Sequence, residues 1–163
     1  MWIIFGVILM GVLGILAGIK INKARKEYQQ TVDQNYNKVR DYSRYYTIIN
    51  ILDKYYNTIN SNNDAETLKL LSNKYKIDNG INKDNINDKI KHYEKMVTYK
   101  GKLMCSKRLG KGFTSYYVSG DVIGSNDLKT YGSEYYDIIL NENEMTFSVS
   151  VIEASEFGGV CHD

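Results

Sequence analysis

The sequence predicts an α+β fold that follows an N-terminal transmembrane helix. Three observations support this prediction: residues 2–19 are apolar and uncharged, apolar residues then recur in steps of three or four as far as residue 98, and strand-like alternation begins after Tyr99. Helices that precede strands along a chain are typical of domains in which helices cover a face of an antiparallel sheet. We therefore divide the chain into a transmembrane anchor at 1–19, a helical stalk at 20–60 and an α+β globular domain at 61–163.

The apolar run from Trp2 to Ile19 is long enough for one membrane crossing, because a bilayer core of about 30 Å needs about 17 to 20 apolar residues. The nearest basic residues follow the run, whereas a cleaved signal peptide carries them before it. This order predicts an uncleaved signal-anchor and a single-pass protein of the cell membrane.

A basic cluster follows the apolar run, and its members are Lys20, Lys23, Arg25 and Lys26. Basic residues that flank a membrane helix tend to stay in the cytoplasm and to attract anionic lipid headgroups. The cluster therefore predicts that membrane lipid is a partner and that the globular domain faces the cytoplasm. An extracytoplasmic domain is the alternative, because many N-terminally anchored proteins export their domains.

Two glycines, Gly14 and Gly18, are spaced so that they lie on one face of the predicted membrane helix. Small residues at this spacing let two helices approach closely, which predicts self-association into a homodimer. The alternative explanation is that glycine is simply frequent in membrane helices.

The helical spacing continues without a proline from Lys20 to about Asn60, which predicts one long amphipathic helix. Its first half has a thin apolar stripe, as in a solvated stalk or loose coiled coil, and its broader second half is expected to pack on the globular domain. Asn63 and Glu66 form a capping pattern, so a second helix is expected from residue 64 to about 76. Apolar spacing predicts a third helix over 84–98.

Four strands and two tight turns are expected after the helices, and they form an antiparallel sheet with one buried face. The turns are Gly110–Gly112 and Asn141–Glu144, and the segment 124–133 is expected to be a mobile loop. The predicted strands are Lys102–Arg108, Phe113–Val122, Tyr135–Leu140 and Met145–Ile152.

Charge is divided unevenly along the chain. Residues 1–111 contain 20 Lys and Arg against 10 Asp and Glu, whereas residues 112–163 contain only Lys129 against 9 acidic residues. An acidic C-terminal region repels phosphate, so a nucleic-acid partner is not expected.

The sequence contains only two cysteines, Cys105 and Cys161. They are too few for a disulfide-built fold. If the domain is exported, they can form a disulfide that ties the C-terminal tail to the first predicted strand; in the cytoplasm they stay reduced.

No catalytic, cofactor or metal site is predicted. His92, His162 and the cysteines lack the four-ligand spacing of zinc sites. The segment Leu109–Gly112 lacks the features of a phosphate loop and is interpreted as a hairpin turn, and Asp121–Gly124 as a strand end.

The expected function is therefore non-enzymatic: the α+β domain mediates protein–protein interaction or assembly at the membrane, with a protein partner that the sequence does not identify. The alternative is an exported domain of a bacterial secretion, conjugation or surface-assembly apparatus. The predicted layout is similar to that of pilins and of bitopic secretion components with a cystatin-like domain. No motif carries either similarity, since the acidic residue that pilins place early in the apolar segment is absent around Gly6.

Overall fold

The computed structural model describes residues 18–23 and 32–161, and its centre is one antiparallel sheet. Five strands lie in the order β1-β2-β3-β4-β5, so each strand pairs with its neighbours along the chain. The strands are β1 (Asn37–Lys38), β2 (Val97–Gly110), β3 (Phe113–Gly124), β4 (Thr130–Asn141) and β5 (Thr146–Ile152). The labelled helices are α2 (Tyr42–Asn60), α3 (Asp64–Leu70), α4 (Asn73–Asp78), α5 (Ile86–Lys89) and α6 (Ala154–Val160). Residues 18–23 are also helical.

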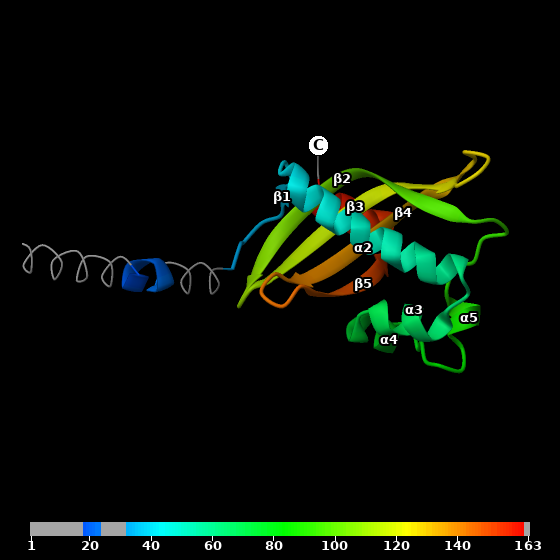
Figure 1. The fold of residues 1–163 in the computed structure, drawn as a ribbon, viewed down its shortest axis with the longest axis horizontal. Helices are drawn as coiled ribbons and strands as arrows, with labels where there is room; N and C mark the ends of the chain where they lie inside the picture. The colour runs from blue at the N-terminus through cyan, green and yellow to red at the C-terminus, as the bar shows by residue number, and fades with distance from the viewer. Residues whose placement is uncertain (1–17, 24–31, 162–163) are drawn as a thin grey trace, which may run out of the picture.

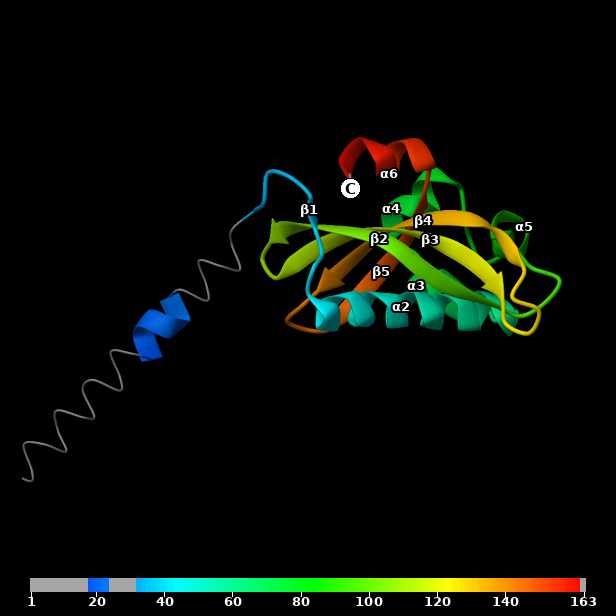
Figure 2. The ribbon, with the colours of Figure 1, turned by 90° about the horizontal axis from the view of Figure 1, so that it is seen from above.

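The long helix α2 covers one face of the sheet (Figures 1 and 2). Its N-cap is Asp41, whose carboxylate accepts hydrogen bonds from the backbone N–H groups of Ser43 and Arg44. Its apolar side chains face the strands, where they form the main core with Met104, Val118 and Ile138. The buried residues of α2 are Ile48, Ile51, Leu52, Tyr55, Tyr56 and Ile59.

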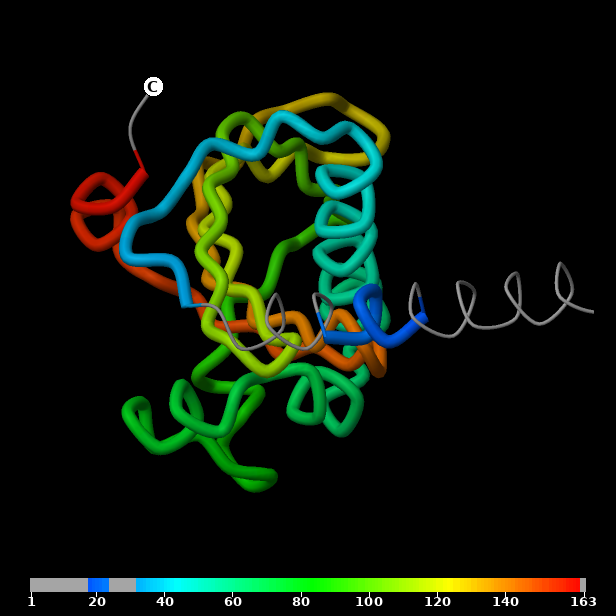
Figure 3. The backbone as a smooth tube through the Cα atoms, turned by 90° about the vertical axis from the view of Figure 1, so that its left-hand side faces the viewer, coloured from blue at the N-terminus to red at the C-terminus, as the bar shows by residue number. Residues whose placement is uncertain are grey.

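The short helices α3, α4 and α5 lie along the edge of the sheet that β5 forms (Figure 3). Ser72, between α3 and α4, donates its backbone N–H to the carbonyl of Val149 in β5 at 2.8 Å. The Ser72 hydroxyl lies 2.7 Å from that of Ser150 and also caps α4. These contacts break the predicted second helix in two and satisfy backbone groups on the edge strand.

The C-terminal helix α6 lies on the face of the sheet opposite α2 (Figure 2). Phe157 of α6 is 6% exposed and packs in a second, smaller cluster with Tyr117 and the Cys105–Cys161 disulfide. This disulfide joins the end of α6 to β2. The sheet is therefore covered on both faces.

Gly120 in β3 lies close to the backbone of β2 and to the Tyr99 ring. A Cβ atom at this position would clash with the carbonyl oxygen of Lys100, the Cα of Gly101 and the ring of Tyr99. Gly120→Ala is therefore expected to lower the free energy of unfolding by about 1–3 kcal/mol, as measured by urea denaturation. Gly158→Ala in α6 is the matched control, because nothing lies within 4 Å of the added methyl group. Equal stability of the two variants would contradict the prediction.

The predicted transmembrane helix requires correction, and so does the prediction of a signal-anchor, single-pass protein of the cell membrane. Within residues 18–23 and 32–161, no helix is long and apolar enough to cross a membrane. The longest of them, α2, has 19 residues and carries Arg44, Asp53 and Lys54 on its polar side. Residues 1–17, which hold most of the predicted anchor, lie outside the described residues.

The predicted four-stranded sheet and continuous stalk are also corrected. The sheet has a fifth strand, β1, which the stalk prediction assigned to helix. Residues 32–41 run beside β2: Val39 donates its N–H to the carbonyl of Met104, and the Tyr36 ring packs 4.6 Å from that of Tyr117. Their apolar residues contact the sheet, which their helix-like spacing did not reveal.

The predicted third helix over 84–98 is reduced to α5, and Val97 instead begins β2. The Asn60 side chain at the end of α2 explains this change, because it donates to the Val97 carbonyl at 2.8 Å and accepts from the Val97 N–H at 3.0 Å. The segment 124–133 forms a hairpin rather than a long loop, with Gly124 donating its N–H to the Lys129 carbonyl.

Candidate functional site

Glu134 is a largely buried carboxylate in the first half of β4. Its register partner in β3 is Gly120, and the Tyr99 ring lies over that glycine. The Tyr99 hydroxyl donates to the backbone carbonyl of Glu134 at 3.0 Å. The glycine thus leaves room beside Glu134 for aromatic rings.

Both oxygens of the Glu134 carboxylate accept two hydrogen bonds each. Oε2 accepts from the hydroxyls of Tyr56 and Tyr136, each at 2.7 Å. Oε1 accepts from the Lys91 ammonium at 2.7 Å and from the Tyr93 hydroxyl. The donors come from α2, from β4 and from the segment that follows α5. One carboxylate therefore joins three parts of the fold.

This environment keeps Glu134 ionised. Burial opposes the charged form, but the hydrogen bonds from Lys91, Tyr136, Tyr56 and Tyr93 outweigh burial and hold the pKa of Glu134 below its ordinary value. Burial in turn raises the pKa of Tyr56 and Tyr136 well above the usual range, and the Glu134 charge adds to that rise. The hydroxyls therefore stay protonated, as donors to a carboxylate must be.

A cavity of about 320 Å³ opens beside this carboxylate, and we call it the tyrosine cavity. Its walls come from α2, α4, β4, β5, the end of α5 and the segment that follows it, and the start of α6. Lys89 and Lys91 also line it, as does Glu153. Its aromatic and acidic lining also includes Tyr55, Tyr75, Tyr93, Tyr135, Tyr136 and Glu134.

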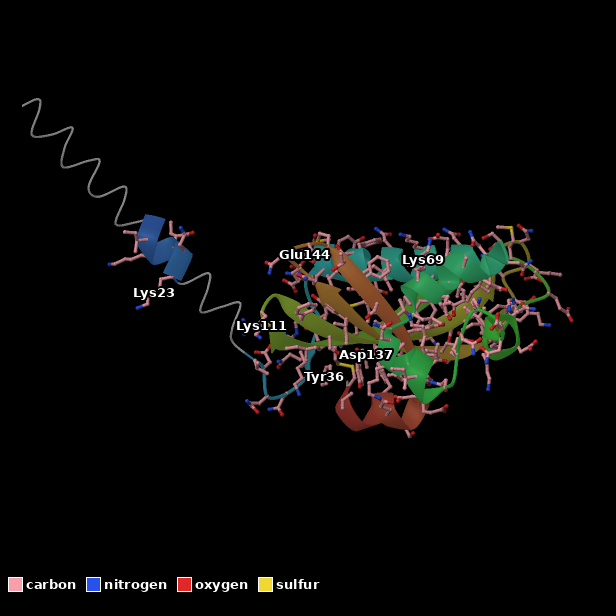
Figure 4. The ribbon with its side chains drawn as sticks, turned by 90° about the horizontal axis from the view of Figure 1, so that it is seen from below. Lys23, Tyr36, Lys69, Lys111, Asp137 and Glu144 are labelled. Atoms are coloured by element: carbon pink, nitrogen blue, oxygen red, sulfur yellow. A yellow bond between two sulfur atoms is a disulfide. The ribbon has the colours of Figure 1, made fainter. Side chains whose placement is uncertain are left out.

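A second cavity, of about 400 Å³, adjoins the first and lies on the α6 side of the sheet. Asp137 lines it and accepts a hydrogen bond from the Ser115 hydroxyl at 2.7 Å, and the Ser115 hydroxyl lies 2.9 Å from that of Tyr36. The Tyr117 hydroxyl donates to Glu156 of α6 at 2.9 Å. Figure 4 shows Asp137 and Tyr36 on this side of the sheet. We call this the acidic cavity.

Burial raises the pKa of Asp137 to about 6, and the nearby Glu156 carboxylate adds to the rise. The folded state therefore binds a proton at Asp137 more tightly than the unfolded state does. Asp137 lowers the free energy of unfolding above pH 6 and does not lower it below about pH 4. Asp137→Asn is expected to stabilise the protein by about 1–2 kcal/mol at pH 7 and by almost nothing at pH 4. Thermal unfolding at both pH values measures the difference. A gain of equal size at both would contradict this account.

Of the residues that the sequence predicts as sites, some lie outside the described residues, some lie in the segment 18–23, and two form a disulfide. Gly14, Arg25 and Lys26 lie outside the described residues. Gly18, Lys20 and Lys23 lie in the short helical segment 18–23 and are exposed, and the predicted roles in self-association and lipid contact stay predictions. Cys105 and Cys161, which the sequence paired only for an exported domain, form a disulfide.

Metal binding finds no support in the part of the chain that the structure describes. Within residues 18–23 and 32–161, no three His, Cys, Asp or Glu side chains are grouped so that they could hold a metal ion. His92 is exposed, beside the tyrosine cavity residues Lys91 and Tyr93.

Sequence reasoning missed Glu134 and its tyrosines. Tyr56 and Tyr93 lie far from Glu134 in the chain, so no local pattern groups them with it. One local signal was present: Glu134 directly precedes Tyr135 and Tyr136 in the first half of a strand whose inner face is apolar. A carboxylate in such a position has to find donors.

Comparison of the chain with protein-family models, with curated proteins and with solved structures finds no match. The candidate site is therefore identified from its geometry alone.

Proposed function

We propose that this protein is an exported, non-catalytic binding domain, in which the tyrosine cavity holds part of a partner. The disulfide between Cys105 and Cys161 is the observation that carries the proposal of export. Disulfides form and persist in oxidising compartments, whereas thiols of the cytoplasm are kept reduced. This agrees with the alternative that the sequence left open, of a domain working outside the cytoplasm in secretion, conjugation or surface assembly.

The two adjoining cavities support a binding role. Small ligands and side chains of partners bind in concave sites where aromatic groups surround a few fixed polar groups. The tyrosine cavity has this composition, and four donors fix the position of its carboxylate. A carboxylate held ionised by donors is suited to attracting a positive group rather than to giving up a proton.

Sidedness and thiol state in intact cells test the proposal of export. The full chain is produced with a C-terminal epitope tag, and cells are treated with an added protease and with a maleimide that does not cross membranes. We expect the protease to remove the tag from intact cells, and both cysteines to react only after reduction. A tag that is protected until lysis, together with cysteines that react without reduction, would overturn the proposal.

A further inference from the structure

We propose that the tyrosine cavity binds a primary ammonium group, which takes the place that the Lys91 side chain occupies in the structure. This inference rests on the proposed binding role but not on export. It names the class of ligand: an alkylammonium, either a free amine or the lysine side chain of a protein partner.

The Glu134 carboxylate favours a cation beside it. Glu134 is buried, ionised and fixed, and its side chain is only 15% exposed. Tyr56 and Tyr136 donate to Oε2. Oε1 is therefore the oxygen whose donor, the Lys91 ammonium, a ligand can replace. The hydroxyls of Tyr56, Tyr93 and Tyr136 already donate to this carboxylate. A fixed carboxylate of this kind accepts a positive group that donates to Oε1.

The aromatic lining favours the same chemistry. The Lys91 Nζ lies 5.1 Å from the centre of the Tyr93 ring as well as 2.7 Å from Glu134 Oε1. Tyr55, Tyr75 and Tyr136 complete the aromatic walls. An ammonium group beside a carboxylate and over an aromatic face gains from both contacts. The chain's own lysine therefore shows where and how an ammonium group fits.

Lys91 is suited to being displaced. It follows α5 in a segment without helix or strand, and its side chain is 57% exposed. Because the lysine is so exposed, water competes for its ammonium group. Moving Lys91 into solvent gives up one partly exposed ion pair and leaves the three tyrosine contacts of Glu134 in place. Lys89, which also lines the cavity, is likewise exposed.

Titration of the purified, disulfide-bonded chain with n-butylammonium, followed by calorimetry and by the tyrosine NMR signals, tests the proposal. The neutral isostere n-butanol is the ligand control. Lys91→Ala removes the internal competitor and should tighten n-butylammonium binding by about threefold or more. Lys69→Ala is the matched protein control, since it removes the same charge and an ion pair with Glu66 in α3, and Lys69 does not line the cavity. It should leave the affinity unchanged.

Three results would overturn the proposal: no binding of n-butylammonium, equal binding of n-butanol, or equal tightening by Lys91→Ala and Lys69→Ala. Glu134→Gln should abolish binding. If that variant does not fold, Lys91→Ala still decides the question, because it keeps the three tyrosine donors of Glu134. A peptide with one lysine distinguishes the two sources: tighter binding than n-butylammonium identifies a protein partner, and weaker binding a free amine. Failure of all these ligands leaves the test of export unaffected.

Discussion

Glu134→Ala is expected to lower the free energy of unfolding by about 3–5 kcal/mol, because it removes the one acceptor that four donors share. The hydroxyls of Tyr56, Tyr93 and Tyr136 would lose their carboxylate, and Tyr136 is only 1% exposed, so water cannot readily replace it. The loss is measured by guanidinium or urea denaturation at pH 7. Part of the cost is also the space that the side chain leaves among the rings.

Glu66→Ala is the matched control for this prediction, because its carboxylate pairs with Lys69 on the exposed surface of α3. An exposed pair contributes about 0–1 kcal/mol, so Glu66→Ala should change the free energy of unfolding very little. If Glu134→Ala cost no more than Glu66→Ala, the central role of Glu134 would be refuted.

The effect of Glu134→Ala should also depend on pH. The folded-state pKa of Glu134 is lowered, so the stabilisation from its ionisation is complete above the unfolded pKa of about 4.3 and is lost as the pH falls through the folded value. The difference in stability between the wild type and Glu134→Ala should therefore shrink in acid. The opposite trend is expected for Asp137, only three residues away: its ionisation lowers the free energy of unfolding as the pH rises, because burial without an ion pair raises its pKa.

Removal of the disulfide is the second large effect. The bond joins residues 56 positions apart, and replacing both Cys105 and Cys161 with serine should lower the free energy of unfolding by about 4 kcal/mol on the chain-entropy model. The loss should concentrate at α6, which packs on the sheet mainly through Phe157. Faster hydrogen exchange in α6 than in α2 would show this localisation.

A reducing agent provides the internal control for the disulfide. It should destabilise the wild type to about the level of the double serine variant and should leave that variant unchanged. A wild type whose melting temperature does not respond to complete reduction would contradict the predicted contribution of the bond.

Local patterns predicted the strands better than they predicted the helices. The four predicted strands overlap β2 to β5, because alternation and glycine-bearing turns depend only on residues that are neighbours in the sequence. The glycine turn at 110–112 joins β2 to β3, with positive φ at all three residues. The capping pattern at Asn63 and Glu66 likewise marks the start of α3, where the Asn63 side chain accepts from the Glu66 N–H.

Other predictions failed where apolar spacing fits more than one structure. Val32, Tyr36 and Val39 are spaced as in a helix, yet residues 32–41 lie extended beside β2. Val97 completes a helical stripe in the sequence, yet Asn60 holds it as the first residue of a strand. The sequence also gave no reason to expect α6, a short helix without a side-chain cap.

The sequence by itself determined which segments alternate, where the chain turns tightly, and that two cysteines are present for one bond at most. The tertiary structure alone decided that those cysteines meet, that a fifth strand covers the edge of β2, and that Glu134 gathers Tyr56, Tyr93, Tyr136 and Lys91. The physical reason is the distance along the chain over which each feature is determined. Strand and helix propensities and turns depend on adjacent residues, whereas a buried charge is stabilised by donors that folding brings from as far as 78 residues away.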